Sequence, residues 1–133
     1  SRTGSGKTIA FLLPAIDSLL LTKPPLDSVS VLVIAPTREL AAQIEEEGKT
    51  LLTFASLTSQ TIVGGTNFGG DVRRMKARLP DILVATPGRL LDHLTNKESP
   101  LSRGALSKLR VVILDEADRL LDMGFRDALQ KIL

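Results

Sequence analysis

The sequence lacks the residues from which several classes of protein are built. It has no cysteine, which excludes a disulfide framework and a thiolate zinc site, and a single histidine, His93, cannot form a histidine-rich metal site. Aromatic residues make up 3%, all of them phenylalanine, which disfavours RNA binding by base stacking. The most apolar stretch, residues 9–21, is interrupted by polar residues and is too short to cross a bilayer. We therefore expect no transition-metal chemistry and no membrane association.

Size and composition describe one ordinary globular domain. The chain has 133 residues, of which 43% are hydrophobic and 24% are charged, and this excludes disorder, collagen and coiled coil. Lysine and arginine number 17 against 15 aspartate and glutamate, so the formal net charge is only +2. That balance alone does not indicate a nucleic-acid-binding protein. The chain begins at Ser1 without a basic leader, so we expect its natural N-terminus to lie upstream, and targeting cannot be read.

Hydrophobic periodicity predicts alternating strands and helices. Three short runs are continuously apolar, as strands buried on both faces of a parallel sheet require, and a fourth run is weaker. The expected strands are residues 31–35, 82–85, 111–114 and, more weakly, 60–63. The expected helices are residues 7–22, 37–54, 68–78, 87–96 and 125–133. Because parallel neighbours need crossover connections, this order predicts an α/β fold, a mostly parallel sheet with helices on both faces.

The first eight residues match a phosphate-binding loop at all but one position, and they run into a predicted helix. Gly4 and Gly6 would let backbone N–H groups approach an anion. Lys7 would reach the β- and γ-phosphates of a nucleotide, and the Thr8 hydroxyl would bind Mg²⁺. The departure is at the first position, where the pattern has glycine and this chain has Ser1. The alternative interpretation is a flexible terminus rich in glycine and serine.

A second candidate motif, residues 111–118, is an apolar strand that ends in carboxylates and resembles a Walker B segment. At the carboxyl end of a parallel strand, Asp115 would face the ligand crevice and could hold the Mg²⁺ of a nucleotide. Glu116 could orient or deprotonate a water that attacks the γ-phosphate. In the alternative interpretation the cluster is structural, with Asp118 capping the next helix. Together with the phosphate loop, this segment favours nucleotide binding.

The sequence Asp115-Glu116-Ala117-Asp118 spells the signature of the DEAD-box ATP-dependent RNA helicases, and the neighbouring motifs agree in kind and order. These are Pro36–Leu40, which resembles motif Ia, Gly64-Gly65, which resembles the paired-glycine motif, Thr86–Arg89, which resembles motif Ib, and Arg119–Phe125, which resembles the stretch after the signature. Because the resemblance runs along the whole chain, the protein is identified as a member of this family. The resemblance implies a RecA-like P-loop domain.

The resemblance also implies roles for particular residues. ATP would be bound by Thr3, Gly4, Ser5, Gly6, Lys7, Thr8 and Asp115, with Mg²⁺ on Thr8 and Asp115. Catalysis would depend on Lys7, Asp115 and the general base Glu116, while Asp118 would couple two lobes. The backbone of a single RNA strand would be held by Thr37, Arg38, Gly65, Thr86, Gly88 and Arg89. Because arginine pairs with phosphate oxygens without reading bases, RNA binding would be largely independent of sequence.

The family's enzyme has two RecA-like lobes, and the resemblance implies that residues 1–133 are an incomplete first lobe. The chain would start inside the phosphate loop and end after the signature, without the second lobe. Central strands would be missing, and we expect a gap in the sheet. Losing an arginine finger alone costs about 10³ to 10⁵ in turnover at related sites, so we expect the isolated chain to be poorly folded and nearly inactive. In the complete protein, ATP-driven closure of the lobes would bend one RNA strand and open a short duplex.

Two other functions stay open. A DNA-directed translocase of the same superfamily is disfavoured by the Asp115–Asp118 signature and by Thr86–Arg89. A nucleotide-gated RNA clamp without turnover would keep the fold, although the residues expected for catalysis are all present. Gly64–Phe68 and Phe125–Asp127 resemble the fungal mitochondrial splicing-chaperone branch of the family, which favours an intracellular protein and, within the cell, a mitochondrial one. The RNA target, protein partners and oligomeric state cannot be read from the sequence.

Two further features are expected to be structural. One predicted helix is crowded with cations, which we interpret as a solvated face rather than an extension of an RNA track; they are Arg73, Arg74, Lys76 and Arg78. His93 lies in another predicted helix with no second ligand in the sequence around it, so it is interpreted as an ordinary helix residue.

Overall fold

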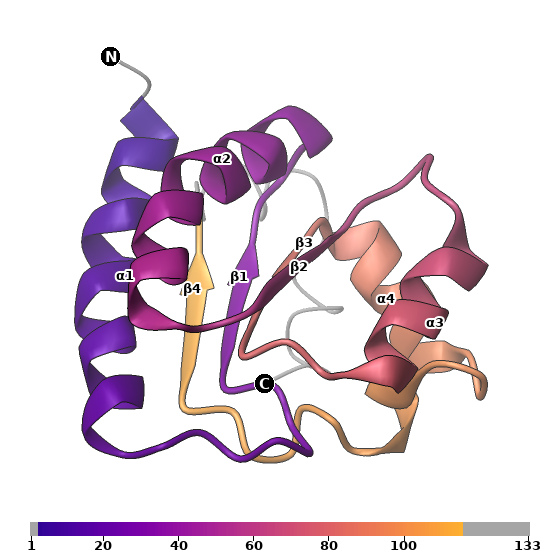
Figure 1. The fold of residues 1–133 in the computed structure, drawn as a ribbon. Coiled ribbons are helices and arrows are strands. Elements are labelled where there is room, and N and C mark those ends of the chain that lie inside the picture. The colour runs from indigo at the N-terminus through magenta and orange to yellow at the C-terminus, as the bar shows by residue number, and fades with distance from the viewer. Residues whose placement is uncertain (1–2, 116–133) are drawn as a thin grey trace.

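The computed structural model describes residues 3–115, and for residues 3–9 and 11 it describes the backbone alone. Strands and helices alternate along the chain as predicted, and they build one sheet with helices on both sides (Figure 1). The predicted helix over residues 125–133 lies outside the described residues, as do Glu116 and Asp118.

Four parallel strands form the sheet in the order β2-β3-β1-β4. They are β1 (Val31–Ile34), β2 (Ser59–Ile62), β3 (Ile82–Ala85) and β4 (Val111–Leu114). In the centre, Val33 of β1 lies opposite Val84 of β3 and Ile113 of β4. Every pair of neighbours in this order is hydrogen-bonded, so the expected gap is wrong for the strands described. Both neighbours of β1, namely β3 and β4, come from the described part of the chain.

The helices are α1 (Thr3–Leu21), α2 (Arg38–Ala55), α3 (Phe68–Ala77), α4 (Pro87–Thr95) and the short 3₁₀ helix η1 (Pro100–Arg103). Capping side chains fix two of the starts. Thr37 Oγ1 accepts a hydrogen bond from Leu40 N at 3.2 Å, and Asn67 Oδ1 accepts one from Gly70 N at 2.8 Å. The sequence does not predict η1, because a single turn has no periodic pattern. Within residues 3–115, no helix has the length and apolar character needed to span a membrane.

Helix α1 begins earlier than predicted. The sequence predicts a phosphate loop over residues 1–8 and a helix from Lys7, whereas the helical backbone extends back to Thr3. Once a helix has formed, each added residue gains a hydrogen bond for one pair of fixed dihedral angles. When the helix extends to Thr3, the backbone groups of this segment gain hydrogen bonds within the helix, although its two glycines have a low helix propensity. The predicted loop conformation of Gly4 and Gly6 is not the one present.

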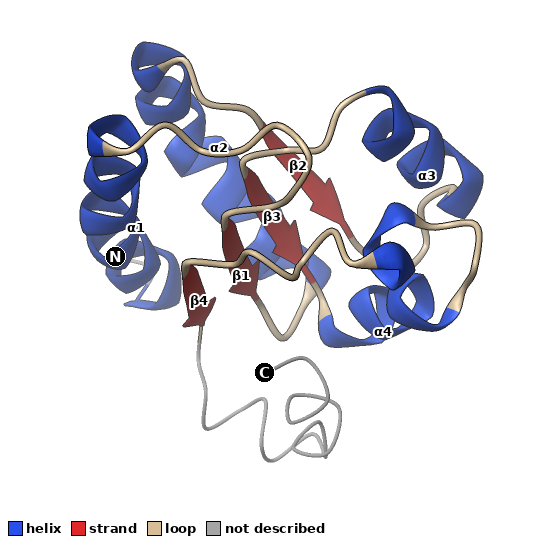
Figure 2. Ribbon diagram, turned by 90° about the horizontal axis from the view of Figure 1, so that it is seen from below, coloured by secondary structure: helices blue, strands red, loops and turns tan. Residues whose placement is uncertain are grey.

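Helices flank the sheet on both sides (Figure 2), and each face of the sheet carries its own hydrophobic core. Helices α1 and α2 pack on one face, where Leu12 and Ile44 meet Val33. Helices α3, α4 and η1 cover the other face, where Met75 and Leu90 lie in the same core as residues of β1 and β3. Successive residues of β1 alternate between these two cores, and all four are buried. Burial on both faces is the reason why the strand sequences are apolar without alternation.

Candidate functional site

The carboxyl ends of the four parallel strands meet at one edge of the sheet, and this edge gathers the predicted motifs. The residues that follow the strand ends are Thr37, Arg38, Gly65, Thr86, Gly88, Arg89 and Asp115. Backbone hydrogen bonds continue between the strand ends. Asp115 N donates to Ile34 O at 2.9 Å, and Thr86 N donates to Ile62 O at 3.2 Å. Ligands of open α/β sheets bind at this edge, so the structure assembles a candidate site from segments distant in sequence.

Asp115 follows β4 and is 4% exposed. Its Oδ2 atom is buried and meets no hydrogen-bond partner among the described residues. An unpaired carboxylate oxygen in a buried place is costly unless a cation or a donor satisfies it. Carboxylate oxygen is also the ligand type that Mg²⁺ takes from proteins, often one or two at a time beside phosphates and water. Asp115 thus has the chemistry and the burial of a magnesium ligand.

The predicted phosphate-binding residues 3–8 form the first two turns of α1. The structure describes only their backbone, so the roles predicted for the Lys7 and Thr8 side chains stay predictions. Glu116 and Asp118 lie outside the described residues, and their predicted roles as general base and lobe-coupling residue are likewise untested. Asp115 is the member of the predicted ATP site whose side chain the structure places.

The loop between β2 and α3 is held against the start of α2 by Arg38. Its Nη1 donates to Gly64 O at 3.3 Å. Gly65 has a φ of +87°, and a Cβ atom at this position would lie 2.5 Å from Arg38 Nη1. The positive φ favours glycine at this position, and a Cβ atom would also displace the Arg38 guanidinium from its place beside the loop. Next to Arg38, the Thr37 oxygen accepts the cap bond of α2, which leaves its hydroxyl hydrogen free to donate to a ligand.

Arg89 holds the same loop from the opposite side. Its Nε donates to Val63 O at 3.0 Å, and its Nη2 donates to Thr66 O at 2.8 Å. Its guanidinium carbon lies 5.6 Å from the centroid of the Phe68 ring, within the range of a cation–π contact. These contacts give Arg89 a structural role that the sequence does not predict. They use two of its five N–H donors, so the others can still pair with a phosphate.

The first turn of α4 presents donors that no side chain caps. Thr86 is extended at the N-cap position, with φ −86° and ψ 150°, and makes no side-chain cap hydrogen bond. Pro87 occupies the start of the helix, and a Cβ atom at Gly88 would meet nothing within 4 Å. An uncapped helix N-terminus with open space beside it attracts anions through its N–H groups and its dipole. Phosphate oxygens fit this place.

His93 lies beneath this surface, in contacts that the sequence does not predict. Its side chain is fully buried and its Nδ1 is 2.7 Å from Ser99 Oγ. Its ring stacks on Phe68 with centroids 4.2 Å apart, and Phe68 in turn meets Arg89. On its other side, Nε2 lies 3.5 Å from Asp71 Oδ2, which is long for a hydrogen bond. The sequence around His93 does not predict these partners, because they lie in other segments, namely α3 and the start of η1.

Burial sets the protonation of His93. Burial lowers the pKa of His93 below its ordinary value, although the carboxylate of Asp71 acts in the opposite direction. Asp71 itself is buried, and Arg74 Nη2 lies 2.7 Å from its Oδ1. The charge of Asp71 is therefore matched by Arg74, and His93 is neutral at physiological pH. The buried contacts of His93 with Asp71 and Ser99 join α4 to α3 and to the start of η1.

Three comparisons with known proteins agree. A family model described as DEAD/DEAH box helicase matches residues 1–133. The chain is 51% identical over 134 residues to DEAD-box ATP-dependent RNA helicase 26 of Oryza sativa subsp. japonica, covering 100% of this chain and 24% of that protein. It is 48% identical over 132 residues to the probable ATP-dependent RNA helicase ddx27 of Dictyostelium discoideum, covering 98% of this chain and 16% of that protein.

Solved structures show the same likeness. The DEAD-box helicase Mss116 bound to ssRNA and UDP-BeF matches with a TM-score of 0.85 and 40% identity, over 99% of this chain and 26% of that chain. The yeast DEAD-box splicing factor Prp28 matches with a TM-score of 0.85 and 34% identity, over 99% of this chain and 31% of that chain. This chain thus spans about a quarter or less of the two relatives and about a third or less of these solved chains. The predicted RecA-like α/β fold is confirmed.

Proposed function

Because the chain belongs to the DEAD/DEAH box helicase family, we propose that the complete protein is an ATP-dependent RNA helicase. It hydrolyses ATP when RNA is bound and uses the cycle to open short duplexes or to remodel RNA–protein complexes. The observation that carries the proposal is the single edge of the sheet that holds Asp115 beside Arg38, Gly65 and the first turn of α4. A carboxylate for a nucleotide-bound cation and donors for an RNA backbone meet there.

The RNA contacts proposed for this edge are contacts to sugar and phosphate. The uncapped N-terminus of α4, the remaining donors of Arg38 and Arg89, and the Thr37 hydroxyl all donate hydrogen bonds. Phosphate oxygens accept such bonds whatever the base, so binding is largely independent of sequence and weakens with salt. A site built on aromatic stacking would need rings at this edge, and the described aromatic contact there is Phe68, which is occupied by His93 and Arg89.

ATP and Mg²⁺ are proposed to bind between Asp115 and the start of α1. The buried, unpartnered Oδ2 of Asp115 suits a magnesium ion, and Thr8 is the second proposed protein ligand. When bound, Mg²⁺ neutralises the charge that develops on the phosphates during transfer. Lys7 supports the β- and γ-phosphates, while Glu116 takes the proton of the attacking water. Asp118 couples this lobe to the second one.

A nucleotide-gated clamp without turnover is the alternative function, because phosphate and RNA contacts alone would keep the protein on RNA. An intracellular and mitochondrial location stays a prediction from the segments Gly64–Phe68 and Phe125–Asp127.

The test is ATP turnover by the full-length protein that carries this chain, with single-stranded RNA, with single-stranded DNA and with neither. A Glu116→Gln variant serves as the control for the catalytic base. RNA-selective stimulation that disappears in the variant supports the helicase. ATP binding without any stimulated turnover would establish the clamp instead, and equal stimulation by DNA would contradict an RNA-specific enzyme.

A further inference from the structure

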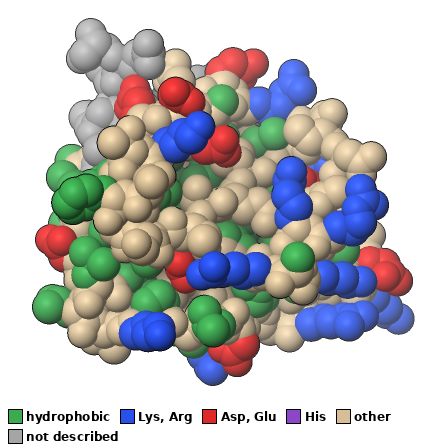
Figure 3. Space-filling view, in the orientation of Figure 1, with side chains coloured by type: hydrophobic (Ala, Val, Ile, Leu, Met, Phe, Trp, Pro, Cys, Tyr) green, Lys and Arg blue, Asp and Glu red, His purple; other side chains and the backbone are tan. Residues whose placement is uncertain are grey.

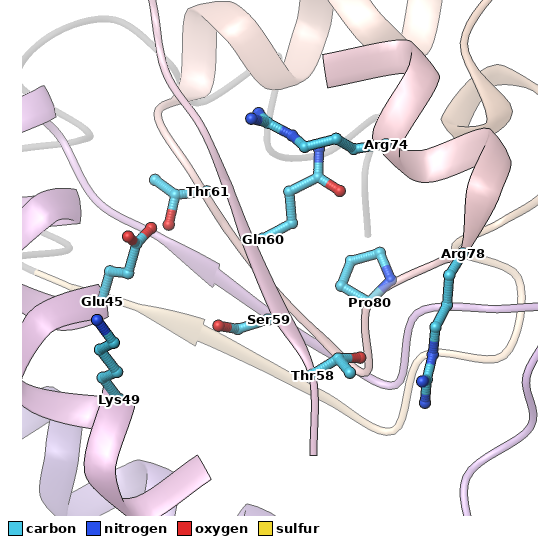
Figure 4. A pocket seen from close by; sticks show the side chains of 9 residues that line it. All are labelled: Glu45, Lys49, Thr58, Ser59, Gln60, Thr61, Arg74, Arg78 and Pro80. Carbon is cyan, nitrogen blue, oxygen red and sulfur yellow. The ribbon is translucent and has the colours of Figure 1, made fainter. Parts of the chain in front are cut away.

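A groove lies along the free edge of β2, on a different part of the molecule from the carboxyl edge. Within residues 3–115, β2 is the outer strand of the sheet and pairs with β3 alone. Beside it is a hollow of about 460 Å³, lined by Glu45, Lys49, Thr58, Ser59, Gln60, Thr61, Arg74, Arg78 and Pro80 (Figure 4). Helix α2 forms one wall of this groove, β2 its floor and α3 with the following turn the other wall. We call it the β2 groove.

The backbone of β2 leaves hydrogen-bonding groups in the groove. Thr58 O accepts from Ile82 N at 3.1 Å, and Ile62 O accepts from Thr86 N at 3.2 Å, so both residues direct their backbone groups toward β3. In a strand these directions alternate from residue to residue. Ser59 and Thr61 therefore direct their N–H and C=O groups away from β3, into the groove. These are the groups to which another extended chain would bind.

Three features that commonly protect an edge strand, namely proline, charge and a bulge, are not found within β2, although the strand is short. Natural proteins block such edges with proline, with inward-pointing charges or with bulges. The four residues of β2 contain neither proline nor charge, and their register with β3 is continuous. The Thr61 hydroxyl oxygen is also buried and meets no hydrogen-bond partner among the described residues, and Figure 4 shows it on the α2 side of the strand. The groove thus offers unsatisfied polar groups along its length.

The walls of the groove are predominantly cationic. Of the nine lining residues, three are positively charged, namely Lys49, Arg74 and Arg78, and one, Glu45, is negative. The space-filling view shows lysine and arginine gathered on the side of this face that α3 occupies (Figure 3). Arg74 already pairs with Asp71, but its side chain is 62% exposed and keeps free donors. Arg74 and Arg78 belong to the cluster of cations that the sequence analysis interpreted as a solvated face.

From the free backbone edge and the cationic walls, we propose that the β2 groove binds an extended acidic segment of a partner protein, which adds to the sheet as a fifth strand beside β2. Backbone hydrogen bonds to Ser59 and Thr61 supply affinity, and acidic side chains of the segment meet Lys49, Arg74 and Arg78. The proposal needs neither RNA nor ATP and is independent of the proposed helicase function.

Two other occupants fit less well. A second copy of this chain, paired through its own β2, would bring the same cationic walls together, and like charges opposite each other are unfavourable. An RNA strand would satisfy the cations, but its phosphate oxygens only accept hydrogen bonds, and its 2′-hydroxyl and base donors do not follow the repeat of N–H and C=O groups along the edge of a strand. An acidic peptide has both donors and acceptors in its backbone.

The probe is a capped, fluorescently labelled peptide of about nine residues that alternates valine with glutamate. Its binding to the full-length protein is measured by fluorescence anisotropy, beside a peptide in which lysine replaces glutamate. We expect the acidic peptide to bind at least about tenfold more tightly. Hydrogen exchange of the segment that contains β2 should slow when this peptide binds, because the outward amides become paired. Equal binding of the two peptides would overturn the proposal.

Peptides with N-methyl groups test the strand geometry. One carries them on all valines and the other on all glutamates, so only one of the two loses the amides that face β2. We expect one to bind about tenfold more weakly and the other to bind almost as the parent does. If neither modification weakens binding, the segment does not add as a strand and the proposal is wrong.

Charge reversal locates the site. Arg78→Glu, at the C-cap of α3, should weaken binding of the acidic peptide about tenfold, whereas Arg73→Glu, within α3 but outside the groove lining, should change it less than about twofold. Arg78→Ala, which removes the charge without reversing it, replaces Arg78→Glu if that variant does not fold. Loss of RNA binding in Arg78→Glu without any peptide binding would assign the groove to RNA. Loss of a dimer in the same variant, again without peptide binding, would assign it to a second copy.

Discussion

The guanidinium of Arg38 lies where the side chain of any other residue at position 65 would begin. A Cβ atom at Gly65 would lie 2.5 Å from Arg38 Nη1, and the φ of Gly65 is +87°. Arg38 reaches the neighbouring carbonyl of Gly64, so it joins the loop after β2 to the first turn of α2. Two segments that are both predicted to hold RNA are thus structurally coupled.

The first prediction concerns Gly65→Ala. The left-handed backbone costs an alanine about 1 to 2 kcal/mol, and the Arg38 side chain must also move. We expect the free energy of unfolding of this domain, measured in urea, to fall by about 1 to 3 kcal/mol, and RNA binding to weaken with it. Gly64→Ala is the matched control, because a Cβ there meets nothing within 4 Å. Equal losses in the two variants would contradict the steric explanation.

Arg89→Lys tests whether Arg89 acts through the several N–H donors of its guanidinium group, and not through its charge alone. Lysine keeps the charge but cannot donate to Val63 O and Thr66 O together while resting on the Phe68 ring. We expect RNA affinity to fall about tenfold, since a charge-assisted hydrogen bond contributes about 1.5 to 3 kcal/mol. The measurement is fluorescence anisotropy with labelled single-stranded RNA at several salt concentrations. Arg103→Lys, in η1, should bind as the parent does, and an unchanged Arg89→Lys would contradict the role.

Asp115→Asn separates stability from nucleotide binding. The substitution removes a buried carboxylate with an unpaired oxygen, so the thermal midpoint without ligand should stay constant or rise. The added stabilisation by a magnesium-bound ATP analogue, about 2.7 kcal/mol at 100 times the dissociation constant, should be lost. Thermal unfolding with and without the analogue measures both effects. Asp92→Asn, on the exposed surface of α4, is the control, and full stabilisation of the Asp115 variant would exclude a magnesium ligand.

His93 predicts a pH dependence of stability. Burial lowers the pKa of His93 in the folded state, whereas the unfolded chain has the ordinary value of about 6.5. Between these two pKa values the unfolded state binds more protons than the folded state. The contribution of His93 to the free energy of unfolding is therefore complete above about pH 6.5 and decreases as the pH falls from there to the pKa of the folded state. The charged groups that bear on it are Asp71 of α3 with Arg89 and Asp92 of α4.

The test of this dependence is urea unfolding between about pH 5 and pH 8. His93→Gln should be less stable at neutral pH by about 2 to 3 kcal/mol, since it loses the Ser99 contact and the ring stack. Its stability should also vary less with pH than that of the parent chain. A variant that kept the parent's pH dependence would show that other groups cause it.

Strands were the most predictable elements. The four observed strands lie within one residue of the expected positions. Three of them are short apolar runs, and β1 and β3 are buried on both faces, whereas β2 is largely polar and was the weaker prediction. The starts of α2 and α3 were nearly as clear, since Thr37 and Asn67 cap them through local hydrogen bonds. Such features depend on residues close in sequence, and a sequence pattern can express them.

The parts that could not be predicted depend on contacts between distant segments. The extension of α1 to Thr3 depends on backbone hydrogen bonding that the phosphate-loop pattern does not describe. The use of Arg89 to hold the loop after β2, and the burial of His93 between α3 and η1, join residues with no common motif. The order of the strands, which makes β2 an edge, is likewise not written in any local pattern.

The sequence by itself determined the fold class, the order of the elements and the chemical types at the site, because hydrophobic period, capping and motif spacing are properties of neighbouring residues. The tertiary structure alone decided which donors of Arg38 and Arg89 are already engaged, which oxygen of Asp115 is left unpaired, and which strand has a free edge. The physical reason is that burial and hydrogen-bond satisfaction are set by groups that come together only when the sheet and its helices pack.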